Sequence, residues 1–198
     1  MKQSGFTLIE LLVGIALMTL ALGFVTLFAM DISDFGSDLN TRLETERELD
    51  LTLRTMISEI RSMGPGENGA YPIAIASASA FTFFSDIDGD NSFEQVRYFL
   101  DGTTLKKGVT EPTGTEPVQY PPANEVVSEA VHWLVPGPIF TYYPAGLPSE
   151  TGPLAAPVDV SAIRLLVISG TTDQDASQPP LPSTLSITVT IRNLRGDI

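Results

Sequence analysis

The fold expected for this chain is decided by residues 6–30, which read FTLIELLVGIALMTLALGFVTLFAM. Glu10 is the only ionisable side chain in this stretch. As a helix, about 25 residues would extend roughly 37 Å, whereas the apolar core of a bilayer, about 30 Å thick, needs about 20. Leu, Ala, Met and Ile dominate the stretch, so helix propensity agrees with hydropathy. We therefore predict a membrane-spanning helix over residues 6–30.

The flanking residues argue against an ordinary secretory signal peptide. Such a peptide has a basic N-terminal region, a short apolar core and a small-residue cleavage site after that core. Lys2 supplies a basic flank, but the apolar run is too long, and the sequence FAMDISDFGSDL that ends it has no A-x-A pattern. The small polar pair Ser4-Gly5 lies ahead of the apolar stretch instead.

That order of residues resembles the type IV prepilin signal. The matching features are a short basic leader, residues 1–5, followed by Phe-Thr-Leu-Ile-Glu at residues 6–10. The resemblance implies that a membrane aspartyl peptidase cuts between Gly5 and Phe6 and methylates the new α-amine of Phe6. The alternative is a plain signal anchor in which Glu10 has no special role.

Glu10 is a functional candidate because a carboxylate within a bilayer is unfavourable unless it is paired. After cleavage ahead of Phe6 it would lie about one helical turn from the new terminal ammonium. The resemblance implies a charge pair between Glu10 and the Phe6 ammonium of a neighbouring subunit during filament assembly. Buried ion pairs specify geometry more reliably than they stabilise, so this pair would set the register between subunits.

Residues 31–63 are predicted to continue the helix in amphipathic form. Apolar residues recur there at helical spacing, among them Leu49, Leu53, Met56 and Ile60. Gly64-Pro65-Gly66 ends the pattern. The apolar stripe is the face expected to pack on a following sheet.

Residues 64–198 are predicted to form a β-rich domain. AFTFFSD at 80–86 and EQVRYFLD at 94–101 flank a turn-rich segment and indicate a hairpin, with a third strand at 103–108. Further strands are expected at residues 130–135, 139–143, 160–169 and 185–194, the last with strict alternation. The predicted class is α+β, a long helix packed on an antiparallel sheet, and this plan resembles the pilin fold.

Two blocks within this domain narrow the resemblance. They resemble minor pilins of the PilW type and J-type minor pseudopilins of type II secretion. The blocks are FTFFSDIDGDNSFEQVRYFLDGTTLK and, near the end of the sequence, SITVTIRN. This implies a structural subunit of a type IV pilus or secretion pseudopilus, in a tip or initiation complex. The implied partners are other minor and major pilins or pseudopilins, the prepilin peptidase and the inner-membrane assembly platform. Whether the system builds pili, secretes proteins or takes up DNA stays open.

The expected location follows from the charge of the leader. Lys2 would stay on the cytoplasmic side, as the positive-inside rule indicates. The chain would then cross the inner membrane once, with its β-rich domain in the periplasm or outside the cell, and it would enter a filament after assembly.

An acidic loop is the one candidate metal site. Asp86, Asp88, Asp90 and Glu94 place oxygen ligands at alternate positions around Gly89, a pattern that suits Ca²⁺. The loop departs from the EF-hand because the glycine comes early and the glutamate is too close. Asp, Gly and Asn are equally expected in a hairpin turn. A calcium-dependent or adhesive surface module on a pilin stalk is therefore the alternative function, and otherwise no cofactor is expected.

Composition excludes several other classes. With 24 acidic against 11 basic residues and a net charge of −13, nucleic-acid binding is not indicated. The absence of cysteine excludes disulfides and thiolate chemistry. A membrane-anchored enzyme would have to use the only histidine, His132, and the sequence shows no nucleophile–base pattern, phosphate loop or zinc motif. We therefore expect no enzymatic activity.

Overall fold

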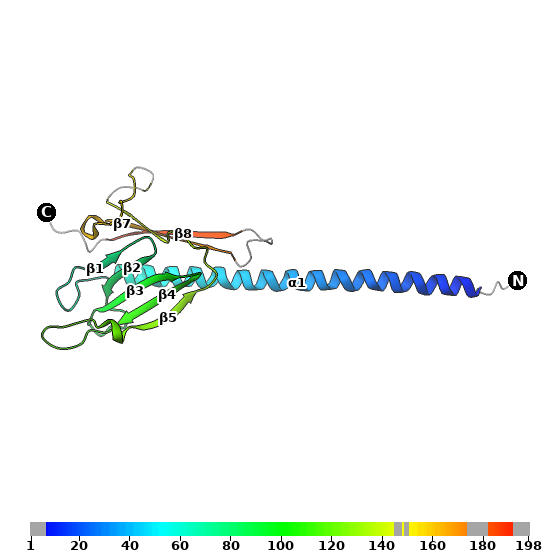
Figure 1. The fold of residues 1–198 in the computed structure, drawn as a ribbon, viewed down its shortest axis with the longest axis horizontal. Helices are drawn as coiled ribbons and strands as arrows, with labels where there is room; N and C mark the ends of the chain where they lie inside the picture. The colour runs from blue at the N-terminus through cyan, green and yellow to red at the C-terminus, as the bar shows by residue number, and fades with distance from the viewer. Residues whose placement is uncertain (1–6, 145–147, 149–150, 174–181, 192–198) are drawn as a thin grey trace. The chain divides into compact units, whose positions relative to one another are not determined.

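The structure, a computed structural model, describes residues 7–144, 148, 151–173 and 182–191, apart from the side chains of residues 34, 35, 37–39, 41 and 42. The chain divides into two compact units, Met1–Glu44 and Thr45–Ile198, which are taken separately below. Figure 1 shows the helix and the strands named in the text.

Helix α1 spans Leu8–Arg61 and has 54 residues (Figure 1). Its segment Leu8–Ser33 is long and apolar enough to cross a membrane by length and composition, and the most apolar part has no buried residues. Large side chains such as Leu8, Leu17 and Phe24 are more than half exposed, which in water would be unfavourable. Lipid or other apolar helices are therefore the surroundings that suit this segment.

The last turns of α1 are buried on one face. Leu49, Leu53, Met56 and Ile60 are each at most 2% exposed, so the predicted apolar stripe is the face that packs on the β-rich part of the second unit. The helix ends at Arg61. Just beyond it, the backbone N–H of Gly64 donates to the carbonyl of Phe84, 3.1 Å away, and this bond links the chain to the sheet.

The larger sheet has five antiparallel strands in the order β1-β2-β3-β4-β5. The bounds are β1 Ile73–Ala76, β2 Ala80–Ser85, β3 Glu94–Asp101, β4 Thr104–Thr110 and β5 Val126–Val131. The predicted hairpin is confirmed, since β2 pairs with β3 from Ala80 opposite Phe99 to Ser85 opposite Glu94. Strand β1 was not predicted, because its four residues are too few to show an alternating pattern.

The smaller sheet has three antiparallel strands in the order β6-β7-β8. They are β6 Phe140–Tyr143, β7 Leu165–Thr172 and β8 Ser183–Thr190, and two short 3₁₀ helices, η1 Pro122–Asn124 and η2 Val160–Ala162, lie in the connections. The two-sheet arrangement differs from the single sheet that the sequence indicated. The α+β class, a long N-terminal helix followed by antiparallel sheets, is confirmed and is consistent with a pilin-like fold.

The strand predicted at 185–194 runs over Ser183–Thr190, and residues 192–194 lie outside the described part of the chain. Two other predicted strand boundaries are wrong. The strand expected at residues 130–135 ends at Val131, because Trp133 adopts a left-handed backbone with φ of 60° that no ladder accommodates. The strand expected at 160–169 begins as η2 instead. There the side chain of Asp159 accepts a hydrogen bond from the Ser161 N–H at 2.9 Å and caps a helical turn.

The core of the second unit joins both sheets to the end of α1. Phe81 of β2 stacks on Phe83 with ring centroids 5.1 Å apart and meets Phe140 of β6 at 5.9 Å. Leu53 of α1 and Leu166 of β7 belong to the same cluster. Burial of these aromatic rings is the main term that holds the sheets together.

Candidate functional sites

The N-terminal candidate site is only partly within the described residues. Gly5 and Phe6, the predicted positions of cleavage and methylation, lie outside them. Glu10 lies in the first turn of α1 with its side chain exposed. Its pairing with the Phe6 ammonium of another subunit stays a prediction.

Glu10 has a local partner that the sequence analysis missed. Its Oε2 accepts hydrogen bonds from the N–H of Thr7 at 3.3 Å and from the Thr7 hydroxyl at 3.2 Å, while the Glu10 N–H donates to Thr7 Oγ1 at 3.4 Å. This reciprocal pattern is a capping box, which T-x-x-E at the start of an apolar run indicates. The carboxylate is thus held over the first turn of α1, where the helix dipole favours negative charge.

The acidic loop between β2 and β3 is shaped by its own carboxylates. Asp86 accepts from the N–H groups of Gly89 at 2.7 Å and Asn91 at 3.1 Å, and Asp88 accepts from Asp90 N–H at 3.2 Å. Such bonds from side chain to local backbone are what Asp provides in turns. Gly89 and Asn91 both take a positive φ, 81° and 67°, in keeping with the turn chemistry of the sequence.

Three of the four predicted metal ligands come together. Asp86, Asp88 and Glu94 each place one carboxylate oxygen within 4.8 Å of the others. Asp90 is not part of this group and accepts instead from the N–H of Ser92 at 2.7 Å. The sequence spacing could not separate Asp90 from the others, because spacing along a turn does not fix which carboxylates converge in space.

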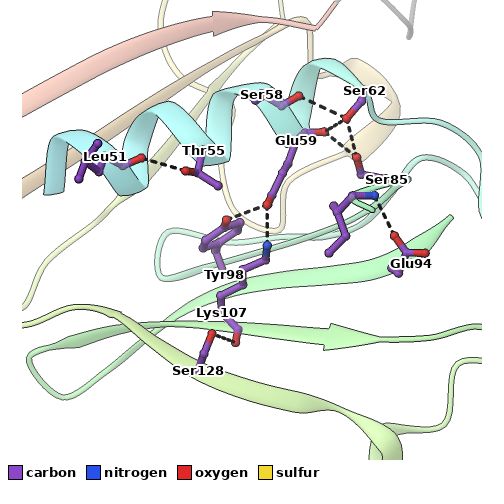
Figure 2. Close-up of polar contacts among 11 residues, drawn as sticks. Leu51, Thr55, Ser58, Glu59, Ser62, Ser85, Glu94, Tyr98, Lys107 and Ser128 are labelled. Atoms are coloured by element: carbon purple, nitrogen blue, oxygen red, sulfur yellow. Dashed lines mark hydrogen bonds and ion pairs between the residues drawn. The ribbon is translucent and has the colours of Figure 1, made fainter. Parts of the chain in front are cut away.

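Glu94 differs from the other acids of the loop because it is buried. It is 0% exposed, and its Oε2 accepts a hydrogen bond from the N–H of Ile87 at 2.9 Å, drawn in Figure 2. Its Oε1 is buried without a hydrogen-bond partner. Burial raises the pKa of Glu94 above its usual range. The hydrogen bond from the Ile87 N–H lowers this pKa, whereas the negative charges of Glu111 and Asp88 raise it.

A second polar cluster fixes the end of α1 on the larger sheet (Figure 2). Glu59 accepts a hydrogen bond from the Tyr98 hydroxyl at 2.8 Å and pairs with the Lys107 ammonium at 2.5 Å. The carbonyl of Glu59 accepts from the Ser85 hydroxyl at 2.9 Å. The signal that sequence analysis overlooked is a glutamate within the apolar stripe, three residues after Met56. These contacts join the end of α1 to β2, β3 and β4 through Ser85, Tyr98 and Lys107.

His132 stands apart from these groups. Its Nε2 lies 3.8 Å from a carboxylate oxygen of Glu129, and both side chains are about half exposed. Such a pair at the surface is solvated and contributes little to stability.

Comparison with protein families matches residues 1–26 to the prokaryotic N-terminal methylation motif. The match covers Gly5, Phe6, Thr7 and Glu10 together with most of the apolar segment of α1. It supports a pilin or pseudopilin type of protein that the prepilin peptidase processes, a group that is structural rather than enzymatic and assembles with other pilins. Comparison with curated proteins gave no match. The apolar helix and the motif together are compatible with membrane anchoring.

Proposed function

We propose that this chain is a minor pilin or pseudopilin, a structural subunit of a type IV pilus or a type II secretion pseudopilus. The observation that carries the proposal is the methylation motif at residues 1–26, joined to an apolar helical segment Leu8–Ser33 and followed by an antiparallel β domain. The protein works by assembly, and the chemical steps in this proposal are those that it undergoes as a substrate of the prepilin peptidase.

The first step is hydrolysis of the Gly5–Phe6 peptide bond. Water adds across the bond, leaving the leader with a new carboxylate at Gly5 and the mature chain with a new ammonium at Phe6. The ammonium then loses a proton, and the free amine takes a methyl group from a methyl donor bound by the peptidase, which leaves without that group; the product is a methylammonium. Until cleavage there is no cation at this position, so processing creates the group that Glu10 requires.

The second step is pairing between subunits. In lipid an isolated carboxylate and an isolated ammonium are both unfavourable, and pairing relieves both at once. Thr7 holds the Glu10 carboxylate over the first turn of α1, which limits the positions that a neighbouring ammonium can take. The pair therefore specifies the axial register of one helix against the next more than it adds stability.

The site of action is the inner membrane and then the filament. Lys2 remains cytoplasmic until cleavage, α1 crosses the bilayer once, and the β domain lies in the periplasm or outside the cell. Its partners are the prepilin peptidase, the assembly platform and related pilins. The sequence blocks over β2–β4 and β8 favour a minor pilin of the PilW type or a minor pseudopilin of the J type. The presence of Glu10 argues against the outermost tip subunit of secretion pseudopili, because that subunit usually lacks this acid.

Mass analysis of the N-terminus of the mature chain tests the proposal. We expect the protein recovered from cells that assemble filaments to begin at methylated Phe6. Protein that retains its first five residues, or that has lost the whole apolar segment, would overturn the proposal.

A Glu10→Gln variant tests the pairing step separately. We expect it to be cleaved but to enter filaments poorly, because the amide carries no charge to meet the ammonium. Glu48→Gln, an exposed change on the same helix beyond the apolar segment, is the matched control and should assemble normally. Equal incorporation of both variants would refute the charge pair while leaving the processing step intact.

A further inference from the structure

The loop between β2 and β3 holds more negative charge in one place than a turn requires. Asp86, Asp88 and Glu94 each bring a carboxylate oxygen within 4.8 Å of the other two. Like charges at this separation repel one another, and more strongly where protein displaces water. Hydrogen bonds from the loop backbone account for the turn, and the bond from the Ile87 N–H holds one oxygen of Glu94 beside the two aspartates.

The buried oxygen of Glu94 is a second observation, independent of the charge of the loop. Glu94 begins strand β3 and is 0% exposed, and its Oε1 has no hydrogen-bond partner. Buried carboxylates in folded proteins are paired, hydrogen-bonded or bound to metals. The other oxygen, Oε2, already accepts the Ile87 N–H. A cation bound by the Glu94 carboxylate together with Asp86 and Asp88 would compensate this buried negative charge.

We propose that Asp86, Asp88 and Glu94 form a binding site for a calcium-type divalent cation at the start of strand β3. This site goes beyond the assembly function proposed above and does not depend on it. Asp90, in the same loop, is not a ligand.

The donor set selects the class of cation. All three side chains offer carboxylate oxygens, and none offers the sulfur or imidazole that soft and borderline metals prefer. Ca²⁺ accepts six to eight oxygens in flexible geometry and suits a loop built from Asp, Asn and Gly. Mg²⁺ demands a smaller and more regular octahedron and keeps most of its waters. Backbone carbonyls and water complete the shell in calcium sites of this kind.

Binding here would strengthen one end of the β domain. Phe93, adjacent to Glu94, accepts a hydrogen bond at its carbonyl from the Tyr120 hydroxyl at 2.7 Å and donates its N–H to Glu67 at 3.1 Å. The loop is therefore tied both to the segment that follows α1 and to the long connection between β4 and β5. In a chain without disulfides, a bound cation would fix these three segments together.

Calcium titration of the full chain in non-ionic detergent, after removal of metals with a chelator, tests the site. We expect the wild type to bind one Ca²⁺ with a Kd of about 0.1–1 mM, the range of extracellular calcium modules, and to melt at higher temperature as it fills. Mg²⁺ alone should bind at least about tenfold more weakly. Isothermal titration calorimetry and thermal unfolding give the two readouts.

Variants that each remove one negative charge show which carboxylates bind the ion. Asp88→Asn and Glu94→Gln should each weaken Ca²⁺ binding about tenfold or more, whereas Asp90→Asn should leave it within about twofold. Asp88 is exposed, so its variant keeps the test valid even where Glu94→Gln fails to fold. Three results would each overturn the site: no binding by the wild type at about 10 mM Ca²⁺, equal affinity for Mg²⁺, or equal weakening by Asp90→Asn.

Discussion

Replacing Glu59 with alanine should loosen the end of α1 from the larger sheet. Glu59 is 11% exposed at its side chain and Lys107 is 19% exposed, and the Tyr98 hydroxyl donates to the same carboxylate. Removing one partner from a buried ion pair lowers stability by about 3–5 kcal/mol, because the other charge is left uncompensated. The ammonium of Lys107 keeps some contact with water, so we expect a loss of about 3 kcal/mol, at the lower end of that range.

Urea unfolding of the full chain in non-ionic detergent, followed by near-ultraviolet circular dichroism, measures this loss. A double-mutant cycle with Glu59→Gln and Lys107→Met should give a coupling free energy of about 1–3 kcal/mol. Asp50→Ala is the matched control, since it breaks an exposed ion pair with Arg54 on the same helix and should change stability little. A coupling below about 0.5 kcal/mol would refute the view that this pair holds the helix in place.

Two further outcomes follow from the packing of the second unit. Gly64→Ala should lower the free energy of unfolding by about 1–3 kcal/mol, because an added Cβ would lie 2.5 Å from the ring of Phe93. Gly137→Ala is the control, since its Cβ would meet no atom closer than 4.0 Å. Equal unfolding midpoints for the two variants would contradict this prediction. Burial raises the pKa values of Tyr98 and Tyr142 above the usual tyrosine range, and the charge of Glu59 adds to the effect at Tyr98. The unfolded chain ionises these groups near pH 10 and the folded chain does not, so stability should fall as pH rises above about 10, by about 1.4 kcal/mol per pH unit for each tyrosine. Spectrophotometric titration would contradict this if both groups ionised near pH 10 in the folded protein.

Elements with a long or regular pattern were predictable from the sequence. The helix followed from an apolar run and then an amphipathic stripe, and the hairpin of β2 and β3 followed from two aromatic strands around a turn-rich segment. β8 followed from strict alternation. Each of these signals is local, since the residues that carry it are close along the chain.

Contacts between distant segments were not predictable in the same way. No local signal places Phe140 against Phe81, or Lys107 of β4 against Glu59 of α1, because these pairs depend on how the sheets fold over the helix. The extent of β5 was predicted wrongly for a related reason. Trp133 fits a strand by propensity, yet it has a left-handed backbone, and Leu134 after it bridges to Thr172 of β7. The tertiary fold overrides propensity here.

The order of residues alone determined that this chain has a processing signal, an apolar helix and a β-rich remainder, because cleavage motifs, hydropathy and strand alternation are written in neighbouring positions. Only the tertiary structure decided that there are two sheets, that Glu59 is paired, and that Asp90 stays apart while Glu94 is buried beside Asp86 and Asp88. The physical reason is that burial and charge pairing depend on distances in space, which chain folding sets and residue spacing does not.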